Sequence, residues 1–160
     1  MNAVALRAEK AVADYLAAAD WSGSGSGTPT CLTSYSRGLY DDPDDQDVMP
    51  NFPRLVVSTN SARPMQRTDL TCEVEIAVEL QLSADDTDEA AVLTTVQVLD
   101  NLILPLFDDT GASALDAAAN DPSGPFTAQF AAPLDFGGSS ISNRSRTFTR
   151  TFTLYCSATL

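Results

Sequence analysis

The side chains of this chain that could carry out chemistry are almost all carboxylates. Of 160 residues, 22 are Asp or Glu, whereas histidine is absent and Lys10 is the single lysine. The absence of histidine excludes Ser-His-Asp and Cys-His catalysis and histidine-based metal sites, and one lysine leaves little amine chemistry. The remaining candidates for an acid, a base or a nucleophile are the carboxylates, three cysteines and four tyrosines.

Paired carboxylates could in principle hydrolyse glycosidic bonds. In this sequence, however, the acidic residues lie in turns, at helix starts and in one regular row along a strand. Each of these positions has an ordinary structural explanation, and no set of residues points to a common centre. We therefore expect no catalytic residues and no cofactor, and the protein is predicted not to be an enzyme.

The three cysteines, Cys31, Cys72 and Cys156, are widely spaced, and each lies in a predicted strand. Their number is odd, and no Cys-x-x-Cys spacing is present, so the sequence predicts neither a zinc site nor a disulfide framework. We expect reduced thiols packed in the interior of an intracellular protein.

An acidic loop is predicted for residues 40–50. Its five aspartates are Asp41, Asp42, Asp44, Asp45 and Asp47. The calcium loop of an EF-hand is excluded because its glycine and its closing glutamate are missing. We expect an exposed loop that is solvated or that binds a basic neighbour, with opportunistic cation binding as an alternative.

The most regular element is the segment 70–83, in which apolar and polar residues alternate. One side carries Leu70, Cys72, Val74, Ile76, Val78, Leu80 and Leu82. The other side carries Thr71, Glu73, Glu75, Ala77, Glu79 and Gln81. Period-two alternation predicts a long β-strand with a buried side and an acidic, wet side, in a sheet that is covered on one side only.

Two helices and several further strands accompany this strand. Residues 2–19 are rich in helix formers, with a narrow apolar stripe of Val4, Ala8, Val12, Tyr15 and Ala19. A second helix is opened by Asp85, Asp86, Asp88 and Glu89, as the helix dipole favours. It has an apolar stripe of Val92, Val96, Leu99, Ile103 and Leu106. Further strands are predicted for 30–36, 53–60, 126–134 and 143–159, a turn-rich link for 61–69, and a short helical piece for 112–120.

The composition indicates a single domain over residues 1–160. Apolar residues make up 44% of the chain, which suits a packed core, and Ser22–Gly27 is predicted to be a flexible connector. The order of elements predicts an α+β fold: one mostly antiparallel sheet with helices packed on one face. With no signal peptide or membrane span expected, we predict a soluble protein made in the cytoplasm of its host.

This organisation, ending in the segment Arg-Thr-Phe-Thr-Arg-Thr-Phe-Thr-Leu at 146–154, resembles the tail terminator proteins of long-tailed bacteriophages. The resemblance covers nearly the whole chain and rests on the order and size of the elements. It implies a virion protein that forms a ring, usually a hexamer, at the head-proximal end of the tail. Such a ring stops polymerisation of the tail tube protein and binds the neck or connector protein. DNA passes through the lumen of the ring. The acidic loop at 41–47 departs from what the family suggests.

Two surfaces are predicted to serve such a ring. Arg146 and Arg150 fall on the side of their strand that otherwise carries residues expected in the core. Together with Arg144 they form the main basic cluster. We predict that this cluster meets Asp41–Asp47 of a neighbouring subunit, although two independent solvated patches are the alternative. Glu73, Glu75 and Glu79 are predicted to line the lumen, where they would repel DNA so that it slides without specific binding.

Other functions remain open. Head-completion and neck proteins share much of the tail terminator fold, and a further tail-tube-associated role is possible on the same grounds. The formal charge of −13 disfavours direct binding to nucleic acid or to anionic membranes, but it would suit a DNA mimic that inhibits a DNA-binding enzyme. The clustering of the acids in one loop, one strand face and helix starts argues against a mimic, which needs them spread along one surface.

Overall fold

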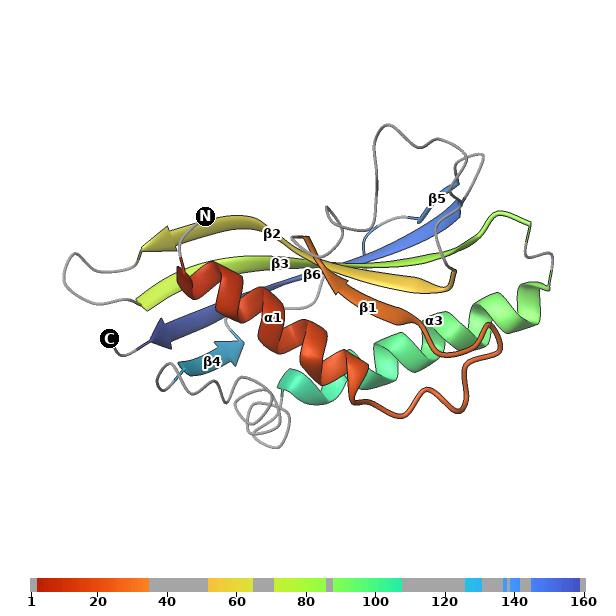
Figure 1. The fold of residues 1–160 in the computed structure, drawn as a ribbon, viewed down its shortest axis with the longest axis horizontal. Coiled ribbons are helices and arrows are strands. Elements are labelled where there is room, and N and C mark those ends of the chain that lie inside the picture. Colours follow the sequence, from red (N-terminus) through yellow and green to blue (C-terminus); the bar gives the residue numbers. More distant parts are fainter. Residues whose placement is uncertain are drawn as a thin grey trace.

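The structure, a computed structural model, describes residues 3–34, 52–64, 71–85, 88–107, 126–130, 137, 139–141 and 145–158. In this part of the chain, a mixed β-sheet carries two helices on one face (Figure 1). The helices are α1 (Ala3–Ala17) and α3 (Glu89–Ile103), and a short 3₁₀ helix, η1 (Leu104–Phe107), follows α3. The strands are β1 (Thr30–Thr33), β2 (Arg54–Pro64), β3 (Thr71–Ser83), β4 (Phe126–Phe130), β5 (Ser139–Ile141) and β6 (Ser145–Ala158).

Two long strands in the middle of the sheet, β3 and β6, organise the fold. They pair antiparallel without a break, from Thr71 opposite Ser157 to Ser83 opposite Ser145. The strand order is β1-β2-β3-β6-β4, and β5 pairs with β6 outside this path. Among the described strands, only β1 and β2 pair in parallel. The predicted α+β fold, with one mostly antiparallel sheet and helices on one face, is confirmed.

Strand β2 is longer than the sequence predicts. The link expected for 61–69 begins later, because β2 continues beside β3 as far as Pro64. The register with β3 shifts between Thr59 and Ser61, so Asn60 is an extra residue in the strand, as in a β-bulge. Asn60, Ser61 and Pro64 are residue types that favour turns, but they remain in the strand, with the bulge accommodating the extra residue. Proline is tolerated at the last position of the strand because no ladder hydrogen bond is needed there.

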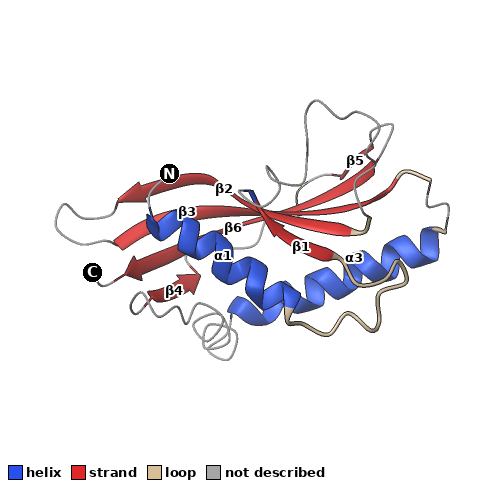
Figure 2. Cartoon of the chain, viewed as in Figure 1, coloured by secondary structure: helices blue, strands red, loops and turns tan. Residues whose placement is uncertain are grey.

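The apolar core lies between the helices and one face of the sheet (Figure 2). Strand β3 directs its even-numbered side chains into this core, and from Cys72 to Leu82 each of them is at most 2% exposed. In β6, Phe152, Leu154 and Cys156 are also buried, as their alternation predicts. Burial of apolar area on this face is the main force that holds the sheet against the helices.

Helix α1 buries a wider face than the narrow stripe predicted for it. Its buried residues are Val4, Ala5, Ala8, Glu9, Ala11, Val12, Ala13 and Leu16. Small alanines allow the helix to pack closely on β1, β2, β3 and β6. After the helix, the buried Trp21 donates a hydrogen bond of 2.9 Å from Nε1 to the Leu16 carbonyl at the helix end, which also accepts the Ala19 N–H at 3.4 Å.

Helix α3 follows its predicted pattern closely. Asp88 caps its N-terminus, where the side chain accepts hydrogen bonds from the N–H groups of Ala90 and Ala91 at 3.1 and 3.2 Å. The predicted apolar stripe is buried or partly buried: Val92, Val96, Leu99, Ile103 and Leu106. Near Pro105, the α-helix gives way to η1. The Tyr15 hydroxyl of α1 donates to the Leu102 carbonyl at 2.9 Å and so joins the two helices.

The glycine- and serine-rich segment 22–27, predicted to be a flexible connector, is bound along α3. The Gly25 N–H donates to Thr94 Oγ1 at 3.1 Å, and the Ser26 N–H donates to Thr95 Oγ1 at 3.0 Å. A Cβ atom at Gly25 would lie 2.6 Å from the backbone of α3, so only glycine permits this approach. Small residues would make a free linker flexible, but in this chain they allow segment 22–27 to pack closely against α3.

Candidate functional surfaces

The predicted acidic row lies on the face of β3 that points away from the helices. Glu73 is exposed there, whereas Glu75 and Glu79 are partly buried. Glu75 Oε1 accepts a hydrogen bond from Asn60 Nδ2 at 3.1 Å, and Glu79 Oε2 accepts one from Gln81 Nε2 at 3.4 Å. The three carboxylates share one face of the strand, and side-chain amides orient two of them.

This outer face is less open to solvent than the alternation predicts. Val56 and Ala77 are 2% and 3% exposed, although both lie outside the core between helices and sheet. Gln81 is also buried, and its Oε1 accepts a hydrogen bond from Nε of the buried Arg54 at 2.5 Å. The Arg54 guanidinium lies 5.9 Å from the centre of the Phe52 ring. The expectation of a fully wet side is therefore corrected: the acidic row is interrupted at Ala77 and ends at Gln81.

Arg150 lies on the core-facing side of β6, and its charge is paired within the chain. Its Nε donates to Oδ1 of Asp100 on α3 at 2.6 Å, and its Nη2 donates to Oδ2 at 3.1 Å. The two side chains are 8% and 22% exposed. This bidentate pair binds Arg150 within its own chain, because α3 brings a carboxylate to the face at which Arg150 points. The contact of Arg150 with a second subunit stays a prediction.

Arg146 lies on the same side of β6, opposite Leu82 of β3 and Ile141 of β5. Its side chain is partly buried, and its Nε is buried with no hydrogen-bond partner in the described part of the chain. A buried donor without an acceptor costs free energy. Of the two described arginines in the predicted cluster, Arg146 is thus the one suited to a carboxylate from elsewhere.

The other members of the predicted interface lie outside the described residues. They are Arg144 and the aspartates Asp41, Asp42, Asp44, Asp45 and Asp47. Their contact across a subunit boundary, and the alternative of cation binding in the acidic loop, therefore stay predictions. The short helix predicted for 112–120 lies outside the described residues as well.

The cysteines do not form disulfides, and none is suited to nucleophilic chemistry by its surroundings. Cys72 and Cys156 are buried directly opposite each other on β3 and β6. Burial raises the pKa of the Cys31 thiol to about 11, so this thiol is protonated at neutral pH and is a weak nucleophile and metal ligand. Within the described ranges, no three His, Cys, Asp or Glu side chains gather as a possible metal site.

A buried carboxylate that the sequence pattern does not reveal lies on α1. Glu9 is 1% exposed, and its Oε1 accepts hydrogen bonds from both the N–H and Oγ of Ser34, each at 2.5 Å. Its Oε2 accepts a hydrogen bond from Thr59 Oγ1 at 3.2 Å. Glu9 therefore joins α1 to β2 and to the residue that follows β1. The role of Glu9 in joining these elements cannot be recognised in the sequence, because a glutamate among helix-forming residues is an ordinary residue of an exposed helix face.

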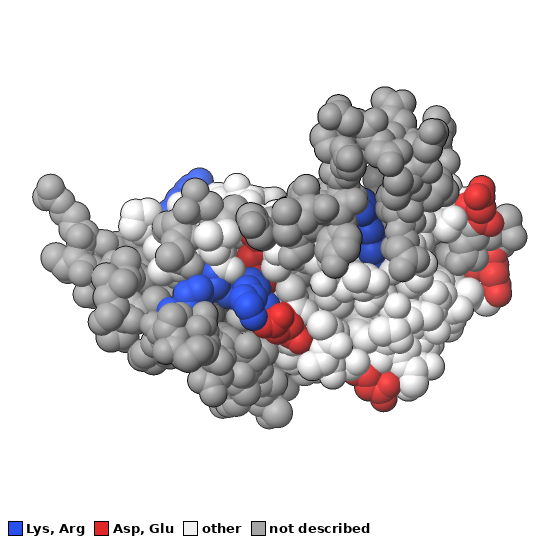
Figure 3. Space-filling model, in the orientation of Figure 1, with Lys and Arg blue, Asp and Glu red and all other residues white. Residues whose placement is uncertain are grey.

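Exposed apolar side chains lie on α3. Leu93 and, just after the helix, Leu104 are 67% and 50% exposed. Figure 3 shows a broad uncharged area where α3 and the segment after α1 lie, with acidic groups mainly at its margins. By length and composition alone, the helical stretch 89–106 would also suit a membrane span, and 28% of it is buried in the structure. Its buried side chains belong to the core shared with the sheet, so we interpret it as a core helix with one unusually apolar outer face.

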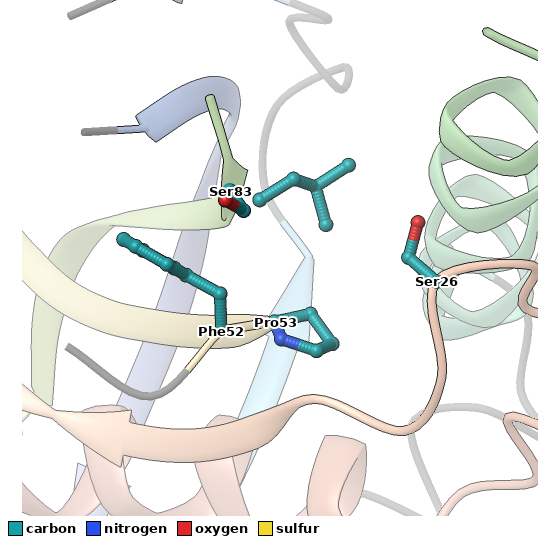
Figure 4. Close-up of a pocket in the computed structure, with 5 residues that line it drawn as sticks. Ser26, Phe52, Pro53 and Ser83 are labelled. Atoms are coloured by element: carbon teal, nitrogen blue, oxygen red, sulfur yellow. The ribbon is translucent and has the colours of Figure 1, made fainter. Parts of the chain in front are cut away.

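A small pocket of about 120 Å³ lies between the sheet and the segment 22–27 (Figure 4). Its lining residues are Ser26, Phe52, Pro53, Leu82 and Ser83. Ligand pockets typically enclose roughly 300–1,000 Å³, so this one is small even for a metabolite. None of these five described lining residues has a titratable side chain, and we assign the pocket no chemical role.

The described surfaces thus offer contacts for macromolecules more readily than a site for a small substrate. The exposed leucines of the α3 region, the unpartnered nitrogen of Arg146 and the carboxylates of β3 are the features to be explained. Comparison of the sequence with known protein families and with curated proteins finds no match.

Proposed function

We propose that the protein is a structural component of a bacteriophage virion. It forms a ring at the head-proximal end of the tail, terminates the tail tube and joins the tube to the neck or connector. The observation that carries this proposal is the apolar outer face of α3, with two half- to two-thirds-exposed leucines in a chain of net charge −13. Apolar surface of this kind is typical of proteins that bind other protein subunits. The order of helices and strands, which resembles that of tail terminators, supports the same assignment.

In the proposed ring of six copies, the outer face of β3 is directed at the lumen. Glu73, Glu75 and Glu79 would then give the wall a net negative charge that repels the phosphates of DNA passing through. Among the described residues of this face, the exposed Arg63 lies opposite Glu73 and the buried Arg54 lies opposite Gln81. A reconstruction of the assembled ring by electron microscopy tests this orientation. We expect the three carboxylates on the inner wall; their position on the outer rim would refute the lumen assignment.

The first test of the proposal is the mass of the native assembly. We expect light scattering and native mass spectrometry to give a closed oligomer of about six chains, as the resemblance implies. Added to the tail tube protein of the same phage, this ring should stop growth of the tube and be found at one end of it. A chain that stays monomeric at every concentration and is missing from purified virions would contradict the proposal.

A second test concerns Arg146, for which we propose a carboxylate partner in Asp41–Asp47 of the neighbouring subunit. Reversal of this charge, Arg146→Glu, should weaken assembly by about tenfold or more, because attraction is replaced by repulsion at a partly buried site. Arg63→Glu is the control: it makes the same charge reversal at an exposed position of β2 opposite Glu73, on the proposed lumen face and away from the proposed contact. Analytical ultracentrifugation reports both. If Arg146→Glu assembles like the parent chain, this contact is not part of the interface.

Two other functions give different results in these experiments. A neck or head-completion protein would also form an oligomer, but it would bind the connector without stopping growth of the tail tube. An acidic DNA mimic would remain monomeric and would bind a restriction or repair enzyme tightly in competition with DNA. The combination of native mass and tube termination therefore separates the three.

A further inference from the structure

The outer face of α3 and the residue that follows it form a continuous stripe, here called the α3 stripe. It consists of Ala90, Leu93, Gln97, Asn101 and Leu104, all of which are exposed. Their spacing of three and four residues places them along one side of the helix. None of them is charged. The stripe thus has the composition of an interface core, which is depleted in charged side chains relative to ordinary protein surface.

Polar groups beside the stripe are already satisfied within the chain. Thr94 Oγ1 donates to the Ala91 carbonyl at 3.0 Å and accepts the Gly25 N–H. Asp100 forms the bidentate pair with Arg150 on the inner side of the helix. Because these groups have partners, covering the neighbouring surface would leave them with hydrogen bonds intact. The segment 22–27 also fixes the helix in place, so little order has to be gained on binding.

The charge of the chain indicates what covers the stripe. A basic partner would be attracted to the many acidic groups and would have no need of an uncharged patch. A partner that carries the same excess of negative charge must instead bind where acidic groups are absent or are paired with a basic side chain, and another copy of this chain is such a partner. We infer that the α3 stripe is the surface through which one copy of the chain binds another. This inference rests on the proposed function, since a ring requires contacts between copies.

The size of the stripe shows how it would contribute to such a contact. A helix of 15 residues is about 22 Å long and about 10 Å wide. Its footprint is roughly a quarter of the ~800 Å² that each partner buries in a standard interface. The stripe therefore forms the apolar centre of the contact, and adjoining polar surface forms the rim.

The test replaces both exposed leucines by aspartate in the full chain, Leu93→Asp with Leu104→Asp. Exposed side chains contribute little to folding, so the variant should keep the parent's melting temperature. Its dissociation constant for self-association should rise about a hundredfold or more, because two carboxylates would have to be desolvated in the contact. The matched control is Leu6→Asp on α1, which is 45% exposed and should leave the constant within about threefold. A benzophenone side chain at position 93 should cross-link two copies of the parent chain.

Each other outcome has a distinct meaning. If the parent chain self-associates and the double variant does so equally well, the stripe is not the contact, while the proposed ring stands. If the parent chain is monomeric at all concentrations, the inference and the proposed function both fail. If the monomeric parent binds phosphatidylcholine vesicles and the double variant does not, the stripe contacts lipid, which overturns the inference.

Discussion

Replacement of Arg150 by methionine is expected to lower the free energy of unfolding by about 3 kcal/mol. The substitution keeps an unbranched apolar stem as far as the position of Nε but removes the guanidinium group and with it both hydrogen bonds to Asp100. Asp100 is 22% exposed and would be left as a largely buried charge without a partner, which costs far more than the pair itself contributes. Urea denaturation followed by circular dichroism measures the change.

The chain contains a matched control for this prediction. Lys10 and Asp14 also form an ion pair, but their side chains are 64% and 45% exposed. Lys10→Met should change the free energy of unfolding by no more than about 0.5 kcal/mol, because water solvates the remaining carboxylate. Removing both charges of the buried pair, with Asp100→Leu added to Arg150→Met, should recover much of the lost stability. A single Arg150→Met variant as stable as the parent would show that the pair is not important for the fold.

The position of Arg150 changes how an interface experiment must be designed. Reversal of its charge would destabilise the subunit, and a subunit that unfolds also fails to assemble. Loss of the oligomer in such a variant would therefore not identify a contact between subunits. The exposed leucines of the α3 stripe allow the question to be asked without disturbing the fold. A variant of the partly buried Arg146 answers it once its thermal unfolding is shown to match that of the parent chain.

The elements that the sequence predicts well are those whose pattern reflects one buried face. In β3, strict alternation from Cys72 to Leu82 predicts the strand, its core-facing side and its length to within one residue. In α3, the spacing of Val92, Leu99 and Ile103 predicts the buried side of the helix. Burial on one face imposes these periods directly, so local sequence is sufficient to recognise them.

The features that the sequence does not predict depend on contacts between distant segments. Segment 22–27 has the composition of a flexible linker, yet its backbone is held by threonines about 70 residues later in the chain. Arg150 and Asp100 are 50 residues apart, and only the fold brings them together. The burial of Val56 and Ala77 on the outer face of the sheet likewise follows from tertiary structure. In each case, one residue's role is set by a partner that no local pattern specifies.

The second large effect is expected at Glu9, the buried carboxylate of α1. Glu9→Ala should lower the free energy of unfolding by about 3 kcal/mol, because it leaves the donors of Ser34 and Thr59 without their acceptor and opens a cavity. Glu9→Gln fills the same volume and keeps one acceptor oxygen, so its loss should be roughly half as large. Urea denaturation compares the two variants with the parent.

Hydrogen exchange distinguishes this local role from a general loss of stability. The Ser34 N–H donates to Glu9, so in Glu9→Ala this amide should exchange faster by more than the global destabilisation explains. Amides of β6 near Thr147, which lies opposite Gln81 and not opposite the Ile76 region that pairs with Thr59, should follow the global change alone. If exchange accelerates equally at the Ser34 amide and at the control amides, Glu9 does not specifically anchor the end of β1. If the urea unfolding curve of Glu9→Ala is the same as that of the parent, the buried carboxylate contributes nothing to stability. A carboxylate in an Ala-rich helix would then need another reason to be buried beside two hydroxyl groups.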